Sequence, residues 1–356
     1  MILIDFSSNV HRHLHNAVKE MKPSKKDGKF VTSEYINYWK HLIFEELFRL
    51  EREFQQYGKM VICLDDFGKR YWRKEFYHLY KANRSKDRGE SDVDFGEFFG
   101  HVNEFVKELQ ENTPWKVFGV EEAEADDIIL VLAKEYANKE PILIYSPDKD
   151  FIQCQRYSDT IKQLSPLTKK YLTFETKSGS MLQWIHEHIC LGDACDNVPR
   201  IVDETEFSTD FIEYLQSQNM SISVSEWKQK SESERDFIEL GFKVANKDCE
   251  VYKKHRFGAS TLSKNIEQYG GLNQWLKTNP LLEENFKRNY ILVMLEGIPE
   301  NIYKNILEEY VSAATSYESK RFENFLSENN LKSIIPLLPS AFRTALDLDF
   351  FDDWSS

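Results

Sequence analysis

Carboxylates recur in this sequence just after short apolar runs. Five of them fall within seven residues at 121–127 (EEAEADD), directly before an apolar helical pattern. Others follow the runs MILI, MVICL and PILIY, and two more stand in GDACDN at 192–197. A helix N-terminus favours acidic groups by only ~0.3–1 kcal/mol each, so this crowding needs another source of neutralisation. Carboxylates without sulfur or histidine ligands are what Mg²⁺ and Mn²⁺ prefer.

The apolar runs predict the strands that position these acids. MILID, MVICLDD, WKVFGV and PILIYSPDKD alternate with helical patterns that begin near Thr32, as a helix N-cap, near 95 and near 125. This alternation is typical of a mostly parallel sheet with helices on both faces. Ligands of such sheets bind beyond the carboxyl ends of the strands. We therefore expect Asp5, Asp65, Asp148 and the cluster near Glu124 to meet at one edge.

This acidic set predicts a pair of divalent ions. One Mg²⁺ usually needs one or two protein carboxylates, and two ions ~3.5–4 Å apart can hydrolyse a phosphodiester. A single Asp after a strand is more often a turn or cap residue, and 121–127 alone would suit a solvated helix start. The joint pattern favours a metal site, with Glu121 and Glu122 left at the surface and Asp66 in a turn. The candidate ligands are Asp5, Asp65, Glu124, Asp126, Asp127, Asp148, Asp150, Asp193 and Asp196.

A basic and aromatic segment contrasts with the net charge of −13. Residues 67–88, the basic segment, hold eight Lys or Arg and two acids, a net charge of +6. Cations neutralise phosphates and aromatic rings stack on unpaired bases, so the segment is a candidate nucleic-acid contact. Trp72, Phe76 and Leu79 suit either base stacking or the core. At helical spacing, one face would carry four candidate cations: Arg70, Lys74, Lys81 and Arg84. Two further candidates are Lys86 and Arg88.

The second half of the chain favours helices. The polar stretch 201–257 is interpreted as either an extra duplex-binding surface or a disordered loop. The tail ALDLDFFDDW at 345–354 is either an unstructured terminus or a peptide that docks on a replication partner, and HRHLH at 11–15 suits surface polarity or a phosphate contact better than a metal. Five cysteines without a C-x-x-C pair indicate reduced thiols in a cytosolic protein. The sequence has neither an apolar run long enough for a membrane span nor a recognisable leader, so we expect neither a membrane protein nor a secreted one.

The ordered motifs LIDF, CLDD, YKANR, EAEADD, SPDKDF and GDACDNVP resemble the structure-specific 5′-nuclease family, which includes flap endonucleases and 5′-nuclease domains of bacterial DNA polymerases. The resemblance covers roughly residues 1–200 and 256–310 and is strongest to phage members. It implies a PIN-type α/β nuclease domain at 1–190 with a basic arch at about 67–92. It also implies a smaller, mainly helical DNA-binding domain at 191–356.

The resemblance also implies residue roles. Asp5, Asp65, Glu124, Asp126 and Asp148 would surround a first metal, supported by Asp127, while Asp150, Asp193 and Asp196 would hold a second. Lys81 and Arg84 match cations that contact the scissile phosphate. The family's duplex-gripping helix–turn–helix is displaced here to 257–276, where an ordinary helix start is the alternative explanation. Its candidate phosphate contacts are Gly258, Ser260, Thr261 and Lys264.

The implied activity is 5′→3′ exonuclease and flap endonuclease cleavage with ribonuclease H activity, which would remove lagging-strand primers in phage replication. Two Mg²⁺ ions, replaceable by Mn²⁺, would be the cofactors. We expect a monomer in the host cytoplasm that binds flapped, nicked or branched DNA and RNA–DNA hybrids, with a sliding clamp and a single-strand-binding protein as candidate partners. The alternatives are a single-strand ribonuclease of the PIN-like fold and a non-catalytic branched-DNA-binding protein.

Overall fold

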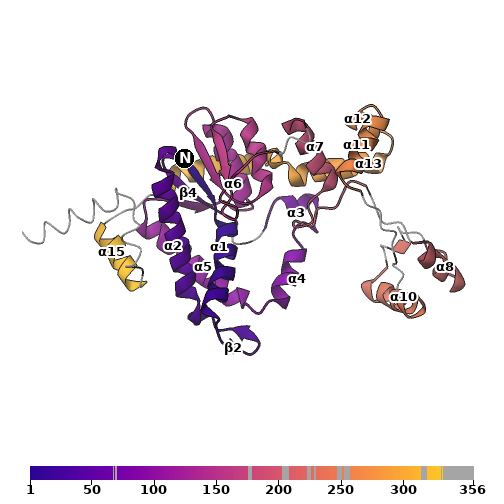
Figure 1. Ribbon diagram of the computed structural model, residues 1–356, viewed down its shortest axis with the longest axis horizontal. Helices are drawn as coiled ribbons and strands as arrows, with labels where there is room; N and C mark the ends of the chain where they lie inside the picture. Colours follow the sequence, from indigo (N-terminus) through magenta and orange to yellow (C-terminus); the bar gives the residue numbers. More distant parts are fainter. Residues whose placement is uncertain are drawn as a thin grey trace, which may run out of the picture. The chain divides into compact units, whose positions relative to one another are not determined.

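The computed structural model (Figure 1) describes residues 1–66, 68, 70–174, 179–202, 208–222, 226–227, 230–246, 251, 257–313, 319–329 and 331, with only the backbone at 85–87, 209, 232 and 319–320. These residues form two compact units. The first comprises Met1–Ile185, Cys195–Asn197 and the described part from Ile291 onward, and the second comprises His186–Ala194 and Val198–Tyr290. The second unit begins at His186, a few residues before the predicted boundary at residue 190. The described helices after Ile291, which were predicted to be part of the second domain, belong to the first unit.

A six-stranded sheet forms the centre of the first unit (Figure 1). Its strand order is β5-β4-β1-β6-β7-β8. Neighbouring strands from β5 to β7 run parallel, and β8 pairs antiparallel to β7. The four predicted strands are confirmed, whereas β7, β8 and the hairpin β2–β3 were not predicted. The bounds are β1 (Ile2–Asp5), β2 (Lys25–Lys26), β3 (Lys29–Phe30), β4 (Met60–Leu64), β5 (Lys116–Gly119), β6 (Ile142–Tyr145), β7 (Ile161–Leu164) and β8 (Tyr171–Leu172).

Helices cover both faces of the sheet, as predicted. On β1, Ile2 and Ile4 pack into one core cluster and Leu3 into the other, because successive side chains of a strand point to opposite faces. Strands buried on both sides are apolar throughout, which explains the continuous apolar runs. The first cluster includes α1 (Phe6–Met21), α2 (Ile36–Glu53), α5 (Phe95–Asn112) and α15 (Ser319–Glu328), and the second α6 (Ala125–Tyr136) and α14 (Glu300–Ser312) (Figure 1).

The predicted N-cap at Thr32 is wrong. Thr32 begins the 3₁₀ turn η1 (Thr32–Glu34), and α2 starts only at Ile36. The Thr32 hydroxyl donates instead to the Glu97 carboxylate at 2.7 Å. A long-range side-chain partner therefore takes the hydroxyl that a cap would use. Further 3₁₀ turns are η2 (Gln55–Tyr57), η3 (Lys149–Arg156) and η5 (Leu295–Gly297).

The second unit is helical. Its core joins Cys190, Ile201, Phe257, Leu262 and Trp275. A separate cluster of Phe211, Leu215, Trp227, Ile238, Phe242 and Val251 lies within the polar stretch 201–257. A disordered loop is therefore the wrong interpretation for the described residues of that stretch. The helices are α7 (Met181–Leu191), which enters this unit, α8 (Thr209–Ser217), α10 (Glu232–Ala245), α11 (Ala259–Gln268), α12 (Leu272–Leu276) and α13 (Pro280–Val293).

The cysteines are buried with one exception in the part of the chain that the structure describes. Cys63, Cys154 and Cys190 are buried and Cys195 is exposed, all as free thiols, and Cys249 lies outside the described residues. Among the described helices, none combines the length and apolarity needed to cross a bilayer. The tail at 345–354 also lies outside the described residues.

Candidate active site

Asp5 stands at the carboxyl end of the central strand β1 and caps α1. Its two oxygens are held by different elements: the Ser8 amide donates at 3.1 Å and the Ser146 hydroxyl, just after β6, donates at 2.7 Å. The side chain is buried, and this burial raises the pKa of Asp5. A carboxylate in this position is fixed in place but not neutralised by a cation of its own.

Asp65 follows the neighbouring strand β4 and ties three elements together. The Ser7 hydroxyl of α1 donates to one oxygen, and the backbone amide of Ala125, at the start of α6, donates to the other at 2.9 Å. Asp5 and Asp65 come from adjacent parallel strands. They therefore lie close together at the sheet edge, as expected for strand-end carboxylates.

The start of α6 carries a capping box of two buried carboxylates. Glu124 caps the helix, and its amide donates to the Asp127 carboxylate at 2.9 Å. Arg73, only 1% exposed, donates to Glu124 at 2.8 Å and to Asp127 at 2.8 Å, and the Trp72 indole donates to Asp127 at 3.1 Å. Burial alone would raise the pKa of Glu124, but Lys81 and Arg73 lower it to about 2.

Two further carboxylates crowd the same edge. Burial and the nearby Asp148 and Asp5 raise the pKa of Asp126 well above its usual value, although Lys81 opposes this. Asp148 keeps an exposed surface, yet desolvation of its carboxyl, Asp150 and Asp5 together raise its pKa to about 7. Raised values of this kind mark negative charge that protein cations do not balance. A divalent cation fits this oxygen-only donor set because it would supply the missing charge.

The predicted phosphate contacts lie beside these acids. The Lys81 ammonium contacts Glu124 and lies 3.4 Å from Asp196, and the Arg84 guanidinium contacts Asp196 at 2.6 Å. The Tyr80 hydroxyl lies 3.1 Å from a carboxylate oxygen of Glu124 and 3.1 Å from one of Asp196. Asp196, a predicted metal ligand, therefore also pairs with two cations of the basic segment. Lys81 has φ = 57°, and its amide donates to the Asp196 carbonyl at 2.9 Å, which fixes the turn.

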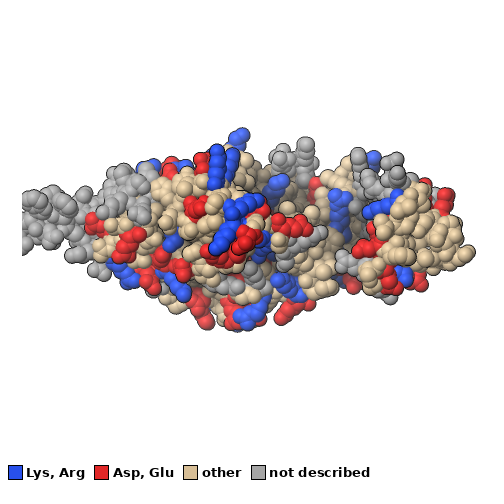
Figure 2. All heavy atoms as spheres, turned by 90° about the horizontal axis from the view of Figure 1, so that it is seen from below, with Lys and Arg blue, Asp and Glu red and all other residues tan. Residues whose placement is uncertain are grey.

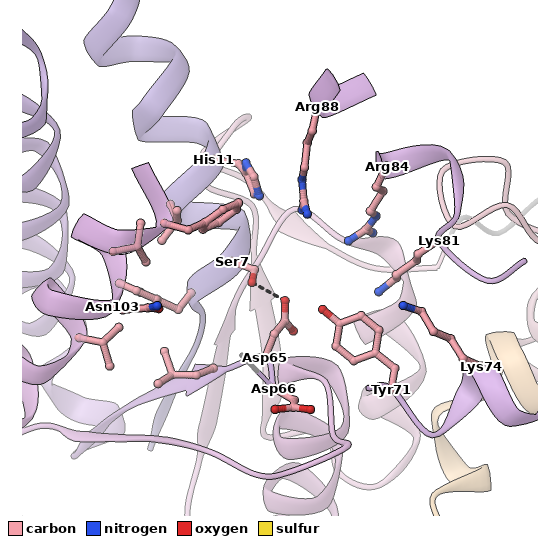
Figure 3. A pocket seen from close by; sticks show the side chains of 16 residues that line it. Ser7, His11, Asp65, Asp66, Tyr71, Lys74, Lys81, Arg84, Arg88 and Asn103 are labelled. Carbon is pink, nitrogen blue, oxygen red and sulfur yellow. Dashed lines mark hydrogen bonds between the residues drawn. The ribbon is translucent and has the colours of Figure 1, made fainter. Parts of the chain in front are cut away.

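A pocket of about 180 Å³ opens over Asp65 (Figure 3). On one side stand four cations, the pocket cations: Lys74, Lys81, Arg84 and Arg88. On the other side α1 and α5 present His11, Asn103 and an apolar wall that includes Phe99. The Arg88 guanidinium lies over the Phe99 ring at 5.2 Å, which holds it at the rim. The pocket can therefore receive an anionic group together with an apolar ring.

The basic segment is not one helix, so the predicted common helical face is wrong. It forms α3 (Arg73–Phe76) and α4 (Asn83–Glu90), separated by turns. Arg70 does not line the pocket but pairs with the exposed Glu121. Trp72 is buried, as one interpretation expected, while Phe76 and Leu79 are 55% and 42% exposed. The Lys86 side chain lies outside the described residues.

The remaining candidates lie in the second unit. Asp193 belongs to it, so its predicted pairing with Asp150 and Asp196 in one metal site stays a prediction. The predicted helix–turn–helix is present as α11 and α12, joined through Gly270 and Gly271. Gly258 caps α11, and Ser260, Thr261 and Lys264 are exposed in its first turns. Their contact with phosphate also stays a prediction.

The sequence did not single out several residues that shape the site. Arg73 was one cation among eight in the basic segment, and its complete burial has no sequence signal. Ser7 and Ser146 hold metal-ligand candidates, and Tyr80 lies between two of them. Ser146 directly follows a predicted strand, which is the one available hint.

The chain is similar to several known proteins in sequence and in fold. Residues 1–183 match the family model described as 5′–3′ exonuclease, N-terminal resolvase-like domain. Ribonuclease H of Enterobacteria phage T4 is 30% identical over 271 residues, covering 76% of this chain and 75% of that protein. The 5′–3′ exonuclease of Bacillus subtilis is 27% identical, over 40% of this chain and 47% of that protein. T5 5′-exonuclease, solved with zinc bound, shares the fold (TM-score 0.50, 12% identity, 93% and 98% covered).

Proposed function

The chain belongs to the 5′–3′ exonuclease family, and from this premise we propose a divalent-metal-dependent nuclease that cleaves phosphodiester bonds near 5′ ends. The observation that carries the proposal is the set of carboxylates at the sheet edge, centred on Asp5, Asp126 and Asp148, directly beside the pocket cations. Acids alone would repel a phosphodiester, and cations alone would bind it without cleaving it.

The proposed cofactors are two Mg²⁺ ions, which Mn²⁺ can replace. Such ions, when bound, supply activated water and stabilise the leaving oxygen. The holding residues would be drawn from Asp5, Asp65, Asp126, Asp148 and Asp150, with Asp193 and Asp196 as further candidates. Glu124 and Asp127 are tied to Arg73, so their role is to fix the shape of the site.

The pocket cations bind the substrate phosphates in this proposal. Lys81 and Arg84 hold the scissile phosphate and stabilise the charge that develops on it. Because both cations pair with Glu124 or Asp196 in this structure, the substrate phosphate must compete with these carboxylates. The apolar wall of α1 and α5 receives the base of an unpaired nucleotide, as base stacking on apolar and aromatic surfaces tolerates any sequence.

The proposed substrates are 5′ flaps, nicked or branched DNA, and RNA–DNA hybrids. The T4 relative named ribonuclease H supports activity on the hybrid, and hence removal of lagging-strand primers in a phage-infected host cytoplasm. A monomer assisted by a sliding clamp or a single-strand-binding protein through 345–354 extends this proposal. A single-strand ribonuclease would have little use for a duplex-binding helix–turn–helix, which is the role predicted for α11–α12.

The test is cleavage of a 5′-labelled flap duplex, a nicked RNA–DNA hybrid and single-stranded RNA, each with Mg²⁺ and with EDTA. We expect Mg²⁺-dependent cleavage of the first two, and a loss of cleavage in Asp126→Asn. Tight binding of the flap without cleavage under all conditions would instead establish a non-catalytic branched-DNA-binding protein. Preferential cleavage of single-stranded RNA would establish the ribonuclease alternative.

A further inference from the structure

A second group of cations, outside the pocket, converges on one buried carboxylate. Glu46 of α2 is 5% exposed and contacts Arg12 of α1, Arg49 at 3.4 Å and Lys169 at 3.7 Å. We call Arg12, Arg49 and Lys169 the Glu46 cation cluster. Three cations against one carboxylate leave a net charge of +2 at this place, because a single acid cannot balance them.

Glu46 is already saturated with partners. Besides the cluster, His13 lies 2.9 Å from its carboxylate and the Tyr145 hydroxyl donates to it at 2.6 Å. Burial would raise its pKa, but His13 and Arg12 bring the pKa of Glu46 down to about 2, so it stays ionised. Burial and repulsion from Arg49 lower the pKa of Lys169, although Glu46 opposes this. The cluster therefore carries surplus positive charge.

The surplus positive charge of the Glu46 cation cluster faces solvent. Arg49 is 38% exposed and Lys169 is 57% exposed at their side chains, so both heads can reach an external anion. Lys169 also has φ = 56°, in the left-handed region that L residues rarely adopt. Glycine or asparagine would satisfy such a turn with less strain. A lysine in this position points to a use for its side chain.

The cluster adjoins the carboxylate site along the sheet edge. Tyr145, which bonds Glu46, directly precedes Ser146, which bonds Asp5. Lys169 follows β7, whereas the pocket cations follow β4, and β1 with Asp5 lies between β4 and β6 in the sheet. The strand-end carboxylates thus have cations on both sides.

We propose that the Glu46 cation cluster binds backbone phosphates of duplex nucleic acid, on the side of the carboxylate site opposite the pocket cations. This inference rests on the proposed function, in which the pocket side receives the unpaired 5′ strand. A nucleic acid that crosses the sheet edge past Asp5 would meet the pocket cations with its single strand and the cluster with its duplex. Arg12 of the HRHLH motif, which has no part in the proposed cleavage chemistry, would then contribute to phosphate binding.

The test is binding in EDTA, where no cleavage occurs, of a 5′-flap duplex and of the flap strand alone. The variants are Lys169→Gly and Arg49→Gln, with Lys304→Ala, an exposed lysine of α14, as the control. We expect each cluster variant to weaken duplex binding at low salt. We also expect it to reduce the slope of log Kd against log salt by about one per cation removed, since each phosphate contact releases about one counterion. Binding of the flap strand should not change.

The glycine variant separates binding from folding. Lys169→Gly removes the charge but relieves the left-handed backbone, so its Tm should equal or exceed that of the parent chain. An unchanged salt slope, or an equal loss on the flap strand, would overturn the inference. Because the readout is binding without metal, either outcome is independent of whether the carboxylate site cleaves. A failure of the proposed function would show only as absent metal-dependent cleavage.

Discussion

At the scale of single residues, the site depends on side chains that are paired before substrate arrives. Lys81 contacts Glu124 and Asp196, and Arg84 contacts Asp196. These pairs keep the cations in fixed positions, so the proposed exchange of the carboxylates for a substrate phosphate would need little reorganisation. Preorganised charge of this kind is a large part of catalysis at oxyanion sites.

Lys81→Ala and Arg84→Ala should each reduce single-turnover cleavage of a flap substrate by about 10²-fold or more, because each removes a group that stabilises transition-state charge. Lys304→Ala, on the outer surface of α14, is the matched control and should cleave normally. Circular dichroism would check that the variants fold. Near-normal turnover in both site variants would show that neither cation contacts the reacting phosphate.

Arg73→Met should destabilise the folded chain by about 3–5 kcal/mol, because it removes the buried cation that bonds both Glu124 and Asp127. Urea denaturation would measure the free energy of unfolding. Arg70→Met, which removes an exposed pair with Glu121, should change it by less than about 1 kcal/mol. If the two variants were equally stable, Arg73 would not neutralise the capping box.

The contrast between the acids and Arg73 shows what single residues reveal. Asp5 and Asp65 were predictable because an acid after an apolar strand has a position fixed by the sheet. Arg73 was not, because nothing in the order of residues distinguishes a buried cation from its exposed neighbours. The contact of the Ser7 hydroxyl was also not predictable, because its partner is distant in sequence, whereas Ser146 has the hint of its position directly after a strand.

At the scale of elements, Glu46 links three parts of the first unit. It connects α1 through Arg12 and His13, β6 through Tyr145, and the β7–β8 turn through Lys169. The elements themselves were largely predictable, since β1, β4 and β6 lie in continuous apolar runs and β5 has Val117 and Phe118 at its centre. The break of the basic segment into α3 and α4 was not, because residue spacing cannot show where tertiary contacts interrupt a helix.

Glu46→Gln should lower stability by the order of 3 kcal/mol at pH 7, since each unit of pKa shift corresponds to 1.36 kcal/mol. The folded pKa of about 2 lies below the ordinary 4.5, so this contribution is present above pH 4.5 and is lost as the pH falls toward 2. Denaturation at pH 7, 5, 4 and 3 should show the difference from the parent chain shrink below pH 4.5. Glu20→Gln, at an exposed site on α1, is the control; a constant difference across the range would contradict the assignment.

At the scale of the whole molecule, the net charge of −13 is an average that conceals local groups of basic side chains. On the face in Figure 2, basic side chains lie in groups directly beside acidic ones. The family resemblance drawn from the motifs, including that to T-even-phage ribonuclease H, is confirmed by the match of residues 1–183 and by the T4 relative. Composition could not have predicted this nuclease family, because it averages over the acids that would bind metal and the cations that would bind nucleic acid.

Crowded acids should make the metal-free protein less stable than its metal-bound form. Asp148, with its pKa raised from 3.8 to about 7, must ionise at a cost as the pH rises. The metal-free chain should therefore lose stability between about pH 4 and pH 7, since the folded state binds more protons there. Mg²⁺ at about 100 times its Kd should restore about 2.7 kcal/mol.

Asp126→Asn provides the test, because it removes one charge from the crowd. In EDTA its Tm should exceed that of the parent chain, while the increase in Tm on adding Mg²⁺ should be largely lost. Asp236→Asn, on exposed α10, should leave both quantities unchanged. A Tm above that of the parent chain in EDTA, and below it in Mg²⁺, is expected only if the carboxylates repel one another until a cation binds between them. A variant less stable in both conditions would mean that Asp126 supports the fold rather than a metal.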